Sequence, residues 1–176
     1  MAKNSAGAVQ AQSPRTNTSE TTSGLSCEAV TEITSELRPL LADVFALYLK
    51  TKNFHWHMTG PHFRDYHLLL DDQAEQIFDM TDDIAERARK LGGTTLHSIS
   101  DIAKHQRLID NNKETNSPQE MLRELHADSR ELTQFLRAAH EICEKHNDVA
   151  TASLIENWLD QTERRTWFLA ETISGS

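Results

Sequence analysis

Cysteine and long apolar runs are both scarce in this sequence, and each shortage excludes a class of protein. The only two cysteines, Cys27 and Cys143, lie far apart and form no C-x-x-C motif, so we expect reduced thiols and no disulfide framework. No stretch approaches the roughly 18 consecutive apolar residues that cross a membrane, and the N-terminus has no apolar signal-peptide segment. We therefore expect a cytoplasmic protein without a membrane partner.

Positive charge is also in short supply. Lysine and arginine total 18 against 27 aspartate and glutamate, which gives a formal net charge of −9 over 176 residues. Such an acidic chain is a poor candidate for broad electrostatic capture of nucleic acid, and it suits the attraction of cations. The length is sufficient for one domain with a sizeable core that needs no disulfide or structural metal.

Large apolar side chains are almost absent from the first 26 residues, which are rich in Ser, Thr, Asn, Gly and Ala. A segment of this composition cannot bury enough surface to offset the entropy lost on ordering. We therefore expect a disordered N-terminal tail over residues 1–26 and a folded domain over residues 27–176.

From about residue 28 the apolar residues recur at three- and four-residue steps, which is the spacing of an amphipathic helix. This pattern predicts a first helix that stops at Thr-Gly-Pro, residues 59–61. It predicts a second helix from about 63 to 91, ended by the Gly-Gly pair that follows.

A clear start signal marks a third helix. Ser117 and Glu120 have the spacing of a capping box, with Pro118 between them, and they open a third helix that ends near residues 146–147. A fourth helix is expected from about 148 to 173.

The long connection between the second and third helices contains LHSISDIAKHQRL, residues 96–108, which predicts a short helix lying across the others. Four long helices, no strand pattern and one long middle connection indicate an all-α, ferritin-like four-helix bundle with a short extra helix in the middle connection.

Two pairs of metal-ligating residue types stand out on the second helix. His67 and Asp71 are four residues apart, so both side chains lie on one helix face, and Asp82 and Glu86 repeat that spacing. Asp82 follows Asp71 by eleven residues, so the two side chains lie on nearly the same face of the helix, about 16 Å apart along its axis. No single ion can contact both pairs.

An antiparallel pairing of two copies of this helix would bring the pairs together. With a two-fold axis near residues 76 and 77, His67 and Asp71 of one copy face the carboxylate pair of the other. Ala74 and Phe78, which lie between the pairs on the same stripe, are apolar, as the centre of such a contact requires.

His55 is a candidate to complete each site. Five helical turns separate it from Leu37, which belongs to the apolar stripe of the first helix, so His55 lies on the inward face of that helix. Two equivalent sites per dimer would each hold two imidazoles and three carboxylates, a ligand set suited to iron, manganese or zinc. No histidine in the chain follows a glutamate by three residues, which disfavours the usual ferritin site within one bundle.

Plainer interpretations exist for each of these residues. Asp82 and Glu86 could form an ordinary solvated face, and His55 could be an inward histidine that binds no metal. His57 and His62 do not lie on the helix face that carries His55, so they suit positions at the surface or in support of the ligands. Trp56 suits a core aromatic.

The sequence HWHMTGPHFRDYHLLLDD (55–72), followed by TDDIAERARKLGG (81–93), resembles the signature of the Dps family, the mini-ferritins or DNA-binding proteins from starved cells. The family pattern has a His-Trp pair, a histidine twelve residues later and an aspartate four beyond it. An Asp-x-x-x-Glu follows, in a run that ends in Ala-Glu-Arg and Leu-Gly-Gly. The resemblance covers roughly residues 28–173, and the five ligand positions are filled by His55, His67, Asp71, Asp82 and Glu86.

The resemblance implies a hollow homododecamer with ferroxidase centres at its two-fold interfaces, where both subunits supply ligands. Proteins of this family bind Fe(II), oxidise it with hydrogen peroxide in preference to oxygen, and store the ferric mineral, which protects DNA and the cell from oxidative stress. The five ligand residues would then be both the metal-binding and the catalytic residues, and iron would occupy two sites per two-fold interface.

DNA is the weaker of the implied partners. The tail offers only Lys3 and Arg15 plus the α-amino group against Glu20, and phosphate affinity scales with the number of neutralised charges. DNA is therefore an uncertain partner, and any binding is expected to be weak and seen at low salt, through the avidity of twelve tails. The alternative function is a nucleoid-associated, DNA-binding structural protein with little ferroxidase activity, and a plain helical scaffold would show neither property.

Two secondary hypotheses follow from the same resemblance. Trp56, beside a ligand, is a candidate to scavenge a stray oxidising equivalent. Glu144, Asp148, Glu156 and Asp160 are candidates to line acidic pores at three-fold axes, although the plainer interpretation is a solvated face.

Overall fold

The structure, a computed structural model, describes residues 23–114 and 116–174, and this part of the chain is helical with no strand. The predicted all-α class is therefore confirmed, and each predicted helix is present close to its expected bounds. Residues 1–22 of the expected tail lie outside the described residues. The helices in chain order are α1 (Cys27–His57), α2 (Phe63–Lys90), α3 (Ile99–His105), α4 (Pro118–Lys145) and α5 (Val149–Ser174).

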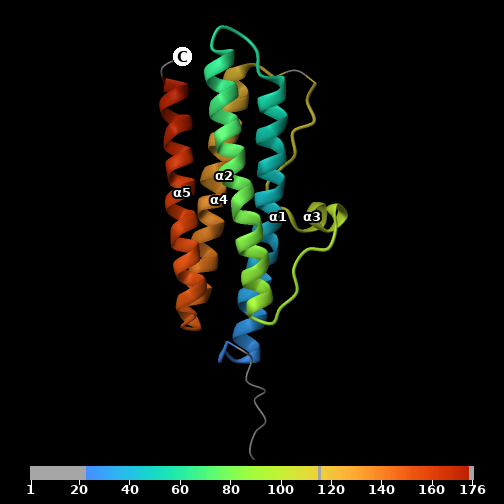
Figure 1. The fold of residues 1–176 in the computed structure, drawn as a ribbon, viewed down its shortest axis with the longest axis vertical. Coiled ribbons are helices and arrows are strands. Elements are labelled where there is room, and N and C mark those ends of the chain that lie inside the picture. The colour runs from blue at the N-terminus through green and yellow to red at the C-terminus, as the bar shows by residue number, and fades with distance from the viewer. Residues whose placement is uncertain (1–22, 115, 175–176) are drawn as a thin grey trace, which may run out of the picture.

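The four long helices lie side by side as a bundle, and the short α3 stands outside it, next to α1 (Figure 1). α1 and α2 run in opposite directions, as do α4 and α5, and the long connection through α3 returns the chain to the end of the bundle where α2 began (Figure 1). None of the described helices is long and apolar enough to cross a bilayer.

Local signals account for the helix boundaries. The Ser26 hydroxyl accepts a hydrogen bond from the backbone N–H of Ala29 at the start of α1. The expected capping box of α4 is present, because Ser117 and Glu120 each accept from the other's backbone N–H. Gly92 ends α2 with φ of 91°, a conformation that glycine adopts without steric penalty.

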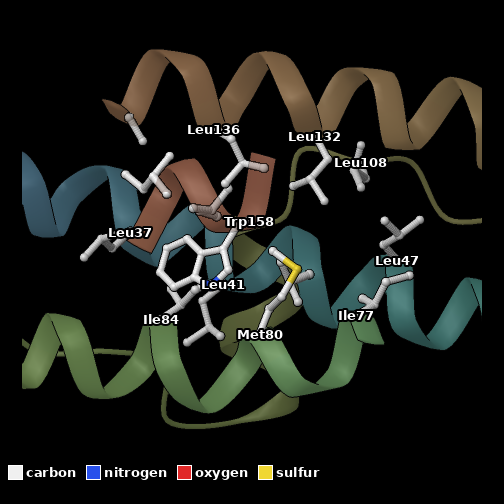
Figure 2. Packing of buried hydrophobic residues seen from close by; sticks show 14 of the residues in the cluster. Leu37, Leu41, Leu47, Ile77, Met80, Ile84, Leu108, Leu132, Leu136 and Trp158 are labelled. Carbon is white, nitrogen blue, oxygen red and sulfur yellow. The ribbon is translucent and has the colours of Figure 1, made fainter. Parts of the chain in front are cut away.

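Side chains from all four long helices meet in one apolar core. Trp158 of α5 packs in it near Leu41, Met80 and Ile84 (Figure 2). Burying a side chain of this size contributes roughly 1.5–3 kcal/mol relative to exposure. This burial fixes the rotation of α1 and α2 about their axes, and so decides which of their polar residues face outward.

A buried carboxylate holds the middle connection against α1. Asp43 is fully buried and accepts hydrogen bonds from the backbone N–H groups of Arg107 (2.5 Å) and Leu108 (3.1 Å). The Arg107 side chain also donates from its Nε to Oδ2 of Asp43 at 2.8 Å. Its guanidinium lies 3.7 Å above the centre of the Phe135 ring. These bonds fix where the connection leaves α3.

Candidate metal centre

His55 and His67 lie against each other at the α1–α2 contact. Their rings stack with centroids 3.7 Å apart. The Nδ1 of His55 is 2.8 Å from the carbonyl oxygen of His67, and the Nδ1 of His67 is 2.9 Å from the carbonyl oxygen of His55. A carbonyl oxygen only accepts, so each Nδ1 donates its hydrogen, and Nε2 is the ring nitrogen left to bind a metal ion.

This reciprocal pairing is the arrangement that metal-binding histidines use, in which one ring nitrogen is fixed by a carbonyl and the other binds the ion. His55 is only 7% exposed, which confirms its predicted inward position, and His67 is half-buried. The backbone hydrogen bonds also hold both rings in place before any ion arrives.

Asp71 lies next to the two imidazoles. Its Oδ1 is 3.8 Å from the Nε2 of His55 and 2.6 Å from the Nζ of Lys52. The hydrogen bond from Lys52 lowers the pKa of Asp71 below its usual value, and the positive charge acts in the same direction. The carboxylate is therefore ionised at neutral pH, and in the single chain it is paired with the Lys52 ammonium group.

Asp82 and Glu86 lie on the same helix but away from this cluster. Both are exposed. The helical rise places Asp82 about 16 Å from Asp71 along α2. Glu86 pairs with Lys90, with 2.8 Å between Oε2 and Nζ, and this hydrogen bond lowers the pKa of Glu86. Over the described residues, no group of three or more His, Cys, Asp or Glu side chains is arranged to hold a metal ion.

The surroundings of the cluster correct one expectation and confirm another. Trp56 is 58% exposed, so its interpretation as a core aromatic is wrong for the single chain. Its exposure follows from helix geometry, because it is 100° away from the buried His55. His57 and His62 are exposed, as expected.

An apolar groove opens beside the cluster, between α1, α2 and α3. Its volume is about 780 Å³. Phe78 of α2 and Leu49 of α1 line it while being 48% and 59% exposed, and Ile99 of α3 is 81% exposed. Trp56 also lines the groove, which therefore continues to the residue next to His55.

Asp148 does not have the exposure that a pore-lining residue needs. It is 5% exposed, its Oδ1 is 2.7 Å from the Nη2 of Arg87, and it accepts from the backbone N–H of Thr151 at 3.1 Å. The interpretation of Asp148 as a pore residue is therefore replaced by a structural role. Asp148 caps the start of α5 and joins α5 to α2 through its ion pair with Arg87. Glu144, Glu156 and Asp160 are exposed.

Sequence reasoning missed the two lysines that accompany the candidate ligands. Lys90 is four residues after Glu86, so the spacing rule that identified the carboxylate pairs would also have identified this ion pair. Lys52 is three residues before His55, on the same side of α1, and its contact with Asp71 depends on how α1 packs against α2.

Known proteins resemble this chain in sequence and in structure. A family model for the ferritin-like domain matches residues 34–175. The DNA protection during starvation protein 1 of Deinococcus radiodurans is 31% identical over 144 residues, which are 78% of this chain and 66% of that protein. The DNA protection during starvation protein of Agrobacterium fabrum is 30% identical over 152 residues, which are 86% of this chain and 94% of that protein.

The same likeness extends to the fold. The X-ray structure of Dps from Thermosynechococcus elongatus superposes with a TM-score of 0.80 at 27% identity, over 83% of this chain and 92% of that one. The ferritin-like architecture expected from helix count and connection length is thereby confirmed. The match to the family model over most of the chain, together with these relatives, shows that the chain belongs to the ferritin-like family and, within it, to the Dps proteins.

Proposed function

We propose that this protein is a ferroxidase and iron-storage protein, in which each iron-oxidising site is shared between two copies of the chain. The observation that carries the proposal is the paired orientation of His55 and His67, with both Nδ1 atoms bonded to carbonyl oxygens and both Nε2 atoms available. Asp71 adds a carboxylate beside them, and the partner copy would add Asp82 and Glu86.

The donor set fits iron. Imidazole nitrogen retains Fe(II), whereas carboxylate oxygen stabilises the Fe(III) product, so a mixed set supports both oxidation states of the substrate. Two Fe(II) ions held together each lose one electron. One hydrogen peroxide molecule takes up those two electrons and two protons and gives two water molecules. Paired transfer avoids the one-electron step that would release hydroxyl radical.

Antiparallel pairing of α2 supplies the missing ligands. The exposed Phe78 lies between the two half-sites on the same stripe of α2. It also lines the apolar groove that includes Ile99 of α3. Exposed apolar area of this kind suits a protein–protein contact. A second copy would cover the groove and bring its carboxylates to His67 and Asp71.

The assembly beyond the dimer is also part of the proposal. The family membership supports a closed dodecamer that stores the ferric product inside, with hydrogen peroxide as the preferred oxidant. Removal of Fe(II) and peroxide together would protect the cell from oxidative damage.

DNA binding is expected to be weak. A gel shift at physiological salt with and without residues 1–26 tests it, because a shift lost on truncation assigns binding to the tail.

A carboxylate-deletion variant tests the proposed activity. Asp82→Ala with Glu86→Ala should abolish rapid Fe(II) oxidation, because it removes the partner's share of every site. The measurement is anaerobic Fe(II) titration of the purified protein, followed by addition of hydrogen peroxide. Asp79→Ala with Asp83→Ala is the matched control, since it removes the same charge from exposed positions of the same helix. Equal rates in the two variants would contradict the proposal.

A further inference from the structure

The His67 ring contacts two other rings. His55 stacks on it with 3.7 Å between the ring centroids and 22° between the ring planes. Phe63 lies against it as well, with 5.0 Å between centroids and 35° between planes. Because His55 already covers one face of the imidazole, Phe63 lies against the opposite face or the edge. A side chain that cannot bind metal therefore packs directly on a candidate ligand.

The turn before α2 fixes the position of Phe63. Gly60 has φ of 96°, a conformation that other residues rarely adopt, and its carbonyl oxygen accepts from the backbone N–H of Phe63 at 3.0 Å. Phe63 is the first residue of α2 and His67 follows it by four residues, so both side chains lie on one helix face. Helical side chains point back toward the N-terminus, which directs His67 onto the Phe63 ring.

His67 is less restrained by its surroundings than His55 is. His55 is buried, whereas His67 is half-buried, and the Nδ1 of each ring is bonded to a carbonyl oxygen. One hydrogen bond by itself leaves a ring free to tilt about the line from donor to acceptor. A tilt of His67 would move its Nε2, which is the atom assigned to the metal ion. The contact with Phe63 opposes that tilt.

The apolar core does not require an aromatic residue at this position. Phe63 is 45% exposed and lies outside the core of the bundle. Its ring packs on His67 instead. Truncating Phe63 should therefore leave the bundle folded, so that a change in metal binding can be assigned to the ligand.

We propose that Phe63 is a positioning residue, which holds the His67 imidazole so that its Nε2 is directed at the metal ion. This inference rests on the proposed function of the site. Phe63 contacts no metal itself and acts only through His67. Its effect is preorganisation, because the ring is ordered when the protein folds and not when the ion binds.

The test measures metal affinity without iron turnover. Full-length wild type and variants are titrated anaerobically with Co(II), using calorimetry for affinity and visible absorbance for the coordination of the bound ion. Phe63→Ala should weaken Co(II) binding by roughly two- to tenfold, the range for one aromatic contact, and should alter the visible spectrum. Phe63→Leu, which keeps apolar bulk without a flat ring, should act in the same direction and serves should the alanine variant fold poorly.

Three controls separate positioning from a general effect on structure. Phe63→Tyr keeps the ring and should restore the wild-type affinity and spectrum. Leu68→Ala removes an apolar side chain of similar exposure, 43%, from the next residue after His67. It should change the affinity by less than about twofold, the range for an exposed substitution. Phe63→Ala added to His67→Ala should weaken binding no further than His67→Ala alone, because Phe63 acts only through that ring.

Three results would overturn the inference. The first is wild-type affinity and spectrum in both Phe63→Ala and Phe63→Leu. The second is an equal loss of affinity in Leu68→Ala and Phe63→Ala. The third is weaker binding in Phe63→Ala accompanied by loss of the wild-type assembly in sedimentation velocity, which would assign the side chain to the contact between subunits.

Failure of the proposed site itself gives a different result. Co(II) binding that is the same in wild type and in the Asp82→Ala, Glu86→Ala variant would contradict the shared site, while the Phe63 variants would still report on His67. Loss of binding in that carboxylate variant, combined with no effect of either Phe63→Ala or Phe63→Leu, would contradict the Phe63 inference alone.

Discussion

At the scale of single residues, Arg165 is the charge that the apolar core tolerates least well. It is 2% exposed, and its Nε and Nη1 make no hydrogen bond to any described residue. Only Nη2 is engaged, at 2.7 Å from the Thr162 hydroxyl and 3.4 Å from the sulfur of Met80. Burial lowers the pKa of Arg165 to about 10, which still leaves it charged at neutral pH.

Replacing this arginine with an apolar side chain should stabilise the protein. Arg165→Met removes two unsatisfied donors and should raise the free energy of unfolding by about 1–3 kcal/mol. Thr162 is not left without a partner, because its hydroxyl also donates to the carbonyl of Trp158. The gain should be equal at pH 6 and pH 8, since the guanidinium is charged in the folded and unfolded states at both.

Urea unfolding of Arg165→Met and wild type at the two pH values makes the measurement. Arg165→Lys is the control, because it retains a buried charge and should give no gain. A lower unfolding midpoint for Arg165→Met would show that the guanidinium makes a favourable interaction that outweighs its desolvation.

At the scale of elements, Asp43 decides where the connection between α2 and α4 lies. Asp43→Asn keeps an acceptor for the backbone N–H groups but loses the charge that pairs with Arg107, whose Nη2 is 2.8 Å away. We expect a loss of about 1–3 kcal/mol, the range for hydrogen bonds to charged groups and unsatisfied buried partners. Hydrogen exchange should accelerate in residues 99–113 more than in α4 or α5.

Asp110→Asn is the matched control, because Asp110 is exposed on the same connection and accepts a side-chain bond from Gln106. Uniform acceleration across all helices would mean that Asp43 stabilises the whole bundle and not this connection. Unchanged exchange in residues 99–113 would contradict the role assigned to it.

The helices could be predicted from sequence because their signals are local. Apolar spacing, the capping box at Ser117 and the Gly-Gly pair after α2 all act within a few residues, and each gave a boundary close to the observed one. The inward position of His55 followed from the same periodicity. These inferences needed no knowledge of which helices touch.

Side-chain partners between helices could not be predicted in the same way. The role of Asp148 depends on Arg87, which is 61 residues away in sequence, and a carboxylate at a helix start gives no sign of such burial. The contact of Lys52 with Asp71 likewise depends on the packing of α1 against α2. By contrast, the exposure of Trp56 could have been predicted, because it lies 100° around α1 from the inward His55.

At the scale of the whole molecule, the proposed site needs two chains and not one. Within a single chain the α1–α2 contact brings together His55, His67 and Asp71. Asp82 lies about 16 Å from Asp71 along α2. The exposed Phe78 and the groove beside it give the surface that a second copy would cover. The proposed site, the apolar groove and the spacing of the two ligand pairs along α2 all favour the same antiparallel pairing of two copies.

Complementation between two inactive variants tests this pairing most directly. One variant carries His67→Ala with Asp71→Ala and the other carries Asp82→Ala with Glu86→Ala, so neither alone can form a complete site. Random pairing on co-expression makes about half of the dimers mixed, and each mixed dimer has one intact site of two. Fe(II) oxidation by peroxide should then recover to about one quarter of the wild-type rate, whereas a mixture no faster than its two parents would contradict a site shared between subunits.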